Sequence, residues 1–219
     1  HLLTEVKGEE NANITIHKVQ LLGSETQHIE HRYASLADSA SVQYVNVELG
    51  GKENIYYYET TLGGVESNID HDLAYLGNDN QRFDISLIMT HKGRKSTSNM
   101  KWGGALSDAS KKTFRGTLDF LQGSVASEGG EEDTCLLLSD KAKSISLPLL
   151  LCKEDNVVGN HAASAGQLEA NKLFYLMSRG FSESEAKHIL VESMLRPIID
   201  KIEDEELGAK VLDVARGKI

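Results

Sequence analysis

Cysteine is scarce in this chain, with only Cys135 and Cys152 among 219 residues. Two cysteines can form at most one disulfide, which is a weak framework for a secreted fold, whereas a reducing cytosol keeps thiols free. The chain has no CxxC pair and no paired Cys/His cluster, so it offers no complete metal cage. The cysteine content therefore favours a cytoplasmic protein.

Long hydrophobic runs are also missing. The longest, residues 85–89 and 147–151, are the size of strands, whereas a helix needs about 20 apolar residues to span a bilayer. No charged-then-apolar secretory start is present. Because the chain begins at His1 rather than Met, we expect a fragment or trimmed form of a longer protein.

Positive charge is in deficit: 23 basic residues stand against 33 acidic ones, a net charge of −10. Proteins that grip nucleic acid without sequence preference neutralise phosphates with Lys and Arg, and no basic stripe with interleaved aromatics occurs here. The sequence also lacks a Walker phosphate loop, a dinucleotide-binding fingerprint and a G-x-S-x-G elbow around Ser139. These absences predict a chain with no nucleic-acid or membrane partner and no ATPase or hydrolase site of its own.

Proline is absent before Pro148, and most of the 19 glycines precede Glu131. Short segments rich in β-branched and aromatic residues fill this part, and the glycines between them tolerate positive φ in tight turns. Apolar strand starts recur at a near-constant interval, at Ile29, Val42, Ile55, Ile69 and Phe83. An antiparallel sandwich or barrel is the commoner all-β fold, but constant spacing is typical of a β-solenoid.

The pattern changes to helical after about residue 160. Apolar residues from Leu168 to Met177 share one helical face, and Arg179 and Gly180 are suited to a helix end. Ser182 and Glu185 form a capping-box sequence for a second helix, and Leu207–Ala215 predicts a third. We therefore expect a β-rich core over residues 1–162 and a C-terminal helical region over 163–219.

The C-terminal motif resembles the SufB/SufD family of the SUF iron–sulfur cluster assembly system. The resemblance is carried by residues 159–168, GNHAASAGQL, and 173–180, LFYLMSRG, with Phe114-Arg115-Gly116 and the stretch 136–140 as upstream landmarks in the right order. Gly166-Gln167-Leu168 is more similar to the SufD branch, and Ala162 stands where SufB-type chains have a glutamate. The resemblance covers about half of the chain, and it implies a right-handed parallel β-helix, which favours the solenoid over the sandwich.

The same resemblance implies a non-catalytic SufD-like subunit that pairs with a SufB-type subunit, or with a second copy of itself, through the end of its β-helix. The helical tail would dock the ATPase SufC, whose ATP hydrolysis would change the geometry of that interface. No cofactor would be bound stably, because a cluster normally needs several thiolates; a transient iron–sulfur cluster could form at the partner interface.

His161 is the strongest candidate site residue, because SufD-like proteins use the matching histidine in cluster assembly and a neutral imidazole can bind iron or relay a proton. The alternative is a histidine that only hydrogen-bonds the strand-to-helix transition. SufD-type chains often carry a cysteine two positions before the histidine, and in this chain that position is Gly159. Cys135 lies near the position of a SufB cluster-associated cysteine, but it and Cys152 are more simply explained as small buried hydrophobes.

Other clusters fit a metal role poorly. On a strand, Asp70 and Asp72 share one face and His71 takes the other, and His28 and His31 are likewise opposed. We expect these residues to face solvent or lie near turns. Tyr56-Tyr57-Tyr58 suggests two packed rings around an exposed one.

Two other functions remain open. A β-solenoid carbohydrate-active enzyme would need Asp70, Asp72 and Asp84 clustered on one face of the solenoid. A SufB-type cluster scaffold is the second, and Ala162 counts against it.

Overall fold

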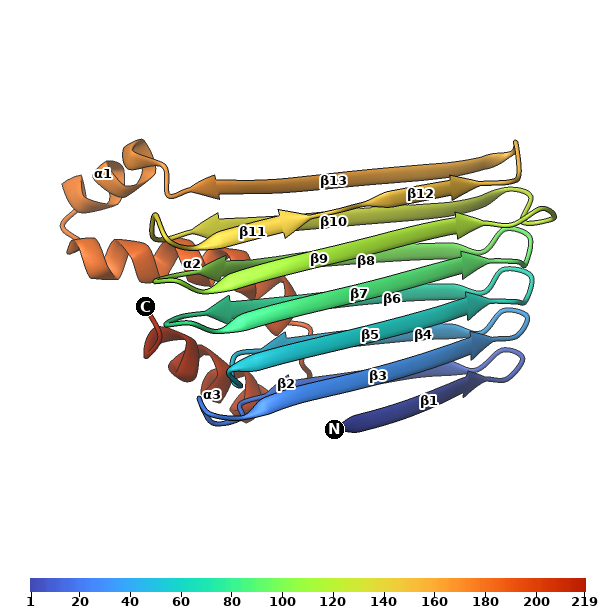
Figure 1. Cartoon of the computed structure of the whole chain (residues 1–219), viewed down its shortest axis with the longest axis horizontal. Coiled ribbons are helices and arrows are strands. Elements are labelled where there is room, and N and C mark those ends of the chain that lie inside the picture. The colour runs from blue at the N-terminus through green and yellow to red at the C-terminus, as the bar shows by residue number, and fades with distance from the viewer.

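A computed structural model describes all 219 residues and shows a parallel β-solenoid with three helices at its C-terminal end (Figure 1). The chain winds between two sheets, and every strand pair is parallel. Sheet A contains β1 (Leu2–Gly8), β3 (Gln27–Leu36), β5 (Glu53–Leu62), β7 (Arg82–His91), β9 (Lys111–Phe120), β11 (Lys143–Ser146) and β12 (Leu149–Cys152). Sheet B contains β2 (Asn13–Gln20), β4 (Ser41–Glu48), β6 (Asn68–Gly77), β8 (Thr97–Leu106), β10 (Ser127–Leu137) and β13 (Val157–Gln167).

The solenoid fold, which the family resemblance favoured over a sandwich, is confirmed. Each coil holds one strand in each sheet, so the interval between strand starts in the sequence is half a coil. Lys111 on β9, for example, pairs with Arg82 on β7, one coil earlier. The coil lengthens toward the C-terminal end, where Lys143 pairs with Lys111.

The turns use residues differently from the sequence-based expectation. Of the glycines that precede β8, only Gly51 has a positive φ, at 74°. Instead, the first five turns from sheet A to sheet B each place a non-glycine residue in the left-handed region, such as Lys95 at 57°, whose N–H donates to a carbonyl of the next coil. Gly93 is required for a different reason, because a Cβ there would lie 1.8 Å from the carbonyl oxygen of Gly64.

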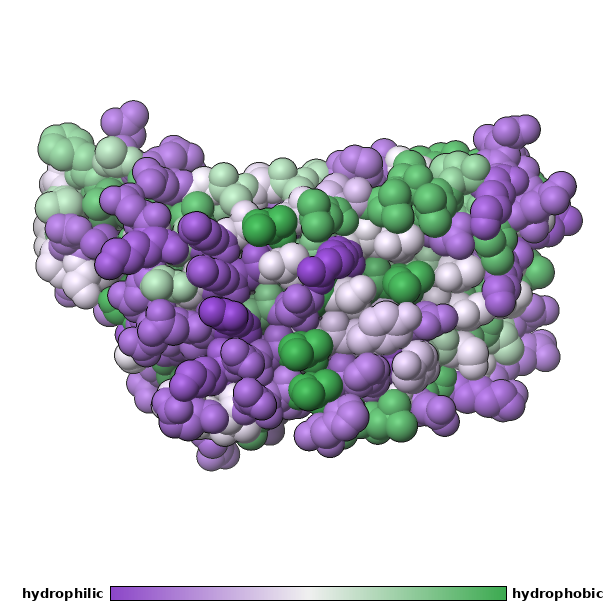
Figure 2. All heavy atoms as spheres, in the orientation of Figure 1, coloured by the Kyte–Doolittle hydropathy of each residue, from purple (hydrophilic) through white to green (hydrophobic).

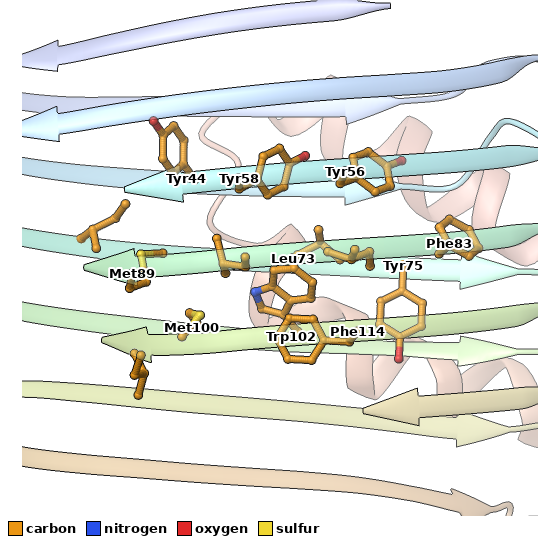
Figure 3. Close-up of a cluster of buried hydrophobic side chains, with 14 of the residues drawn as sticks. Tyr44, Tyr56, Tyr58, Leu73, Tyr75, Phe83, Met89, Met100, Trp102 and Phe114 are labelled. Atoms are coloured by element: carbon orange, nitrogen blue, oxygen red, sulfur yellow. The ribbon is translucent and has the colours of Figure 1, made fainter. Parts of the chain in front are cut away.

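The main core lies between the two sheets and consists of inward-facing side chains stacked coil upon coil (Figure 3). Aromatic rings dominate it: Trp102 on sheet B and Phe114 on sheet A have centroids 4.4 Å apart. Tyr56 and Tyr58 point into this core while Tyr57 points outward, as expected. Alternation of inward and outward residues, with a period of two, is what builds this layer.

A second core joins the outer face of sheet B to the helices. The helices are α1 (Ala170–Ser178), α2 (Glu183–Ile199) and α3 (Glu205–Arg216). Val45, Val47 and Leu76 on sheet B pack in one cluster with Val191 and Leu195 of α2. The second halves of β4, β6 and β8 are therefore buried on both faces.

The helix ends follow the sequence signals. The Ser182 hydroxyl accepts from the Glu185 N–H at 3.2 Å, and the Glu185 carboxylate accepts from the Ser182 N–H at 2.7 Å, which completes the capping box. Strand β13 continues to Gln167 and α1 begins at Ala170, whereas the sequence placed the change at residues 162 and 163. None of the three helices has the length and apolar character needed to cross a membrane.

Candidate functional site at the terminal coil

The last coil of the solenoid, formed by β11, β12 and β13, leaves one strand edge of each sheet without a neighbour. His161 lies in the middle of β13 and is exposed. Its register partner on β10 is Glu131, which pairs in turn with Met100 on β8. Because paired residues of parallel strands point to the same side, Glu131 and His161 both face the interior of the solenoid.

Glu131 is only 4% exposed, and neither of its carboxylate oxygens has a hydrogen-bond partner. The carboxylate occupies the space that a side chain at Gly116 on β9 would fill: a Cβ at Gly116 would lie 2.3 Å from Oε2 of Glu131. Burial, together with the nearby charge of Asp133, raises the pKa of Glu131 to about 7. At neutral pH this carboxyl group therefore titrates between its acid and carboxylate forms.

Sheet A is interrupted beside this carboxyl group. Strand β11 ends at Ser146, opposite Phe114, and β12 begins at Leu149, opposite Thr117. Leu147 and Pro148 stand outside the strands, so Gly116 has no paired strand residue on its outer side. The terminal coil therefore has a local break in the sheet next to Glu131.

A buried ion pair lies next to Glu131, at the following inward-facing position of β10. Nζ of Lys112 is 2.6 Å from Oδ1 of Asp133, and both side chains are completely buried. The Ser146 hydroxyl also donates to Asp133. All charges of this group are matched within the solenoid, and the arrangement fits a structural role.

Cys135 is 2% exposed and belongs to the main core. Burial raises the pKa of its thiol, and the charge of Lys112 opposes this only in part. Its register partner on β13 is Ala165, four residues beyond His161, or roughly 13 Å along a strand. Cys135 and His161 therefore do not form a common ligand set, and the thiol is a buried hydrophobe as expected.

Cys152 differs from the expectation. It was predicted to be buried, but it is exposed at the end of β12, because no further coil covers that strand. Nowhere in the chain do three or more His, Cys, Asp or Glu side chains gather in a geometry that could hold a metal ion.

The expectation that the remaining histidines and acids face solvent or turns is wrong for three of them. His71 is 1% exposed and packs against Tyr44, Tyr58 and Trp102, and burial keeps its pKa well below the usual value.

His28 is 9% exposed and faces the interior beside Glu30. Asp72, at 3%, is covered by Lys201, which donates to its carboxylate at 2.5 Å. The opposed faces predicted for each pair are nevertheless as observed.

Three acids needed for a carbohydrate-active site are not brought together. Asp70 and Asp72 lie on the outer face of sheet B, where Asp70 accepts from Asn99 at 2.9 Å. Asp84 lies on β7 in sheet A, on the other side of the solenoid, and pairs with Arg115. The geometry gives no support to a polysaccharide-cleaving carboxylate cluster.

A second internal polar network lies in the first coils. Lys18 bonds Glu48 at 2.6 Å and also pairs with Glu30, while Arg32 contacts Glu30 at 2.7 Å. Burial alone would raise the pKa of Glu30, but the hydrogen bond from His28 and the charges of Lys18 and Arg32 outweigh it and hold the pKa low. This network is closed within the solenoid, and its acids are paired.

The sequence singled out His161 as a candidate site residue but did not draw attention to its register partner, Glu131. The two residues are 30 positions apart, which is one full coil at this end of the solenoid. The regular repeat in the first coils is shorter, so extrapolating it would have placed a different residue beside His161.

The chain is similar to known proteins over most of its length. Residues 1–194 match the family model described as SUF system FeS cluster assembly, SufBD core domain. The chain is 26% identical over 220 residues to the iron–sulfur cluster assembly protein SufD of Bacillus subtilis, covering 100% of the chain and 50% of that protein. It is 23% identical over 202 residues to the Escherichia coli protein of the same description, covering 92% and 48%.

A chloroplastic SufBD family protein of Arabidopsis thaliana, ABCI8, is 27% identical over 177 residues, covering 80% of the chain and 31% of that protein. The chain thus spans about half the length of the SufD relatives it matches. Given the match over most of its length and the parallel solenoid, this chain belongs to the SufBD core family of the SUF iron–sulfur cluster assembly system.

Proposed function

We propose that this chain acts as a SufD-type, non-catalytic subunit of a cytoplasmic SUF assembly complex. In this role the terminal coil pairs with a SufB-type subunit and the helical region docks the ATPase SufC. The nascent iron–sulfur cluster is the cargo of the complex, formed transiently at the subunit interface near His161, and no cofactor is held stably by this chain. ATP hydrolysis on SufC changes the geometry of that interface.

The observation that carries the proposal is the family membership combined with an apolar, uncovered terminal coil. Hydrophobic side chains gather over β11 and β12 at the upper edge of the face shown in Figure 2. They are Ile145, Leu147, Leu149 and Leu151, each 38% to 53% exposed. Contiguous exposed apolar residues mark interaction surfaces more often than free surface.

Helix α1 supports the second contact. None of its residues is buried, and two of its aromatic side chains are largely exposed: Phe174 at 74% and Tyr175 at 56%. A helix with an apolar surface and no buried residue gains stability from a partner that covers it. By contrast, α2 and α3 cover sheet B, so deleting everything after Ser182 would also expose the core residues beneath them.

Two substitutions test the contacts without disturbing the fold, in cells that co-express SufB and SufC from the same organism. Leu149→Glu should abolish co-purification of SufB, and Phe174→Glu should abolish that of SufC. Ile55→Glu is the matched control, because Ile55 is 46% exposed on β5, away from both surfaces. If both variants keep both partners, the proposed contacts are wrong; a change in self-association of Leu149→Glu alone would instead identify a second copy as the partner.

The role of His161 is tested separately. His161→Ala should lower the iron and sulfide content of the purified complex while melting temperature and subunit composition stay unchanged, because the side chain is exposed. A normal cluster content would show that His161 is dispensable for assembly.

A further inference from the structure

Four of the five buried acidic residues of the chain are paired with a lysine, and one is not. Glu30 and Glu48 are paired with Lys18, Asp72 with Lys201, and Asp133 with Lys112. Glu131 alone has neither a cation nor a hydrogen-bond donor on its carboxylate. A buried polar group without a partner is costly, and one that persists in a fold calls for a specific explanation.

The backbone around Glu131 provides room for its carboxylate. Gly116 leaves a space that any other residue would fill, because a Cβ there would lie 2.3 to 2.5 Å from the carboxyl atoms. The sheet is also interrupted beside Gly116, between Ser146 and Leu149. Glu131 thus lies beside the break between β11 and β12 in the terminal coil.

The neighbour of Glu131 on the next strand is His161. The two residues are in register on β10 and β13 and point to the same side, and neighbouring strands lie about 4.8 Å apart. No further strand follows β13, so the imidazole is the outermost group of this row and the carboxylate is the group directly behind it. A carboxylate that accepts one imidazole N–H fixes the ring orientation and leaves the other nitrogen free to act.

We propose that Glu131 is a positioning residue for His161: it accepts the imidazole N–H and orients the ring toward the cargo at the subunit interface. The unpartnered carboxylate is the acceptor, Gly116 provides the space, and the partner subunit, by covering the coil, holds the two groups together. This inference rests on the proposed function of His161 and adds a second residue to it.

The test compares Glu131→Gln with wild type and with Asp70→Asn. Asp70 is a suitable control because it lies nearby on the outer face of the same sheet, where its loss removes one negative charge but no neighbour of the imidazole. The first measurement is the ¹⁵N shifts of the His161 ring as a function of pH, in the chain alone and in the SufB complex. The second is iron and sulfide per purified complex.

We expect Glu131→Gln to change the tautomer balance of His161 in the complex, since the carboxylate that would accept one ring N–H is gone. Cluster content should fall about tenfold or more, as is typical when the acceptor behind a histidine is removed. Asp70→Asn should change neither, and SufB and SufC should still co-purify with both variants.

Unchanged His161 shifts in the Glu131→Gln complex would overturn the inference, as would a changed cluster content without any change at the ring. The two levels of proposal remain separable. If His161→Ala has normal cluster content, the proposed role of His161 fails, while the ring shifts still report whether Glu131 contacts it.

Discussion

Lys112 and Asp133 meet inside the solenoid from opposite sheets, with Nζ of Lys112 2.6 Å from Oδ1 of Asp133. Both are fully buried, and the Ser146 hydroxyl also donates to the carboxylate. The pair joins β9 to β10 and, through Ser146, to the first strand of the terminal coil. A matched buried pair of this kind is sensitive to the loss of either partner.

Lys112→Met should therefore lower the free energy of unfolding by about 3 to 5 kcal/mol, because Asp133 is left buried without a counter-charge. Urea unfolding at pH 7 measures this change. The double variant Lys112→Met/Asp133→Leu should recover most of the loss, since it removes both charges. A single variant as stable as wild type would show that the pair does not stabilise this end of the solenoid.

Glu131→Gln should change how stability depends on pH. Because the pKa of Glu131 is raised to about 7 in the folded chain, the folded state binds more protons than the unfolded state between pH 4.5 and 7. The contribution of this group is thus present at low pH and is lost as pH rises, by roughly 3 kcal/mol in total. The free energy of unfolding of wild type and Glu131→Gln should be measured at pH 4.5, 6 and 8. Relative to wild type, the variant should become more stable as pH increases. The same pH dependence in both proteins would contradict a raised pKa for the buried Glu131 carboxyl group.

His91 should have the opposite effect. Its ring nitrogens bond the hydroxyls of Ser96 at 2.7 Å and Ser98 at 2.9 Å, and burial lowers its pKa to about 4. The unfolded state then binds more protons between pH 4 and 6.5, so the contribution is present near neutrality and is lost on acidification. Between pH 6.5 and 5 it amounts to about 2 kcal/mol. His91→Gln should lack this part of the acid sensitivity in unfolding measurements at the two pH values; an equal loss in both proteins would refute it.

Gly116→Ala should be destabilising because the new methyl group meets the Glu131 carboxylate. Overpacking of this kind typically lowers stability by about 1 to 3 kcal/mol. The same substitution in a Glu131→Ala background should have little effect, since the carboxylate is gone. A double-mutant cycle by thermal unfolding measures the coupling, and additive effects would show that Gly116 is not required for the position of Glu131.

The fold could be predicted because its repeats are visible as local patterns. Alternation within segments such as Phe83–Leu87 indicated the strands. Their constant spacing left a sandwich and a solenoid open, and the family resemblance favoured the solenoid. The capping box at Ser182 and Glu185 marked a helix start directly. The first strand, β1, was not recognised, because it lies at the exposed end of the solenoid.

The site could be predicted only in part, because its geometry depends on register. His161 carried a family-like motif, whereas Glu131 became visible only when β10 and β13 were aligned. The buried positions of His28 and His71 were missed for a related reason: alternation shows that two residues face opposite sides but not which side is the interior. The side chain of His71 faces the interior, where it packs against three aromatic residues from three different strands.

The docking of the helices on sheet B has a consequence for the order of folding during synthesis. Neighbouring coils contact residues about 30 positions apart, whereas Lys201 reaches Asp72 across 129 positions and Lys218 reaches the carbonyl of Leu76 across 142. Coils can thus form one after another as the chain leaves the ribosome, but their apolar outer stripe, with Val45 and Leu76, has no cover until α2 and α3 are made. The nascent chain is therefore most vulnerable to aggregation just before α2 and α3 emerge.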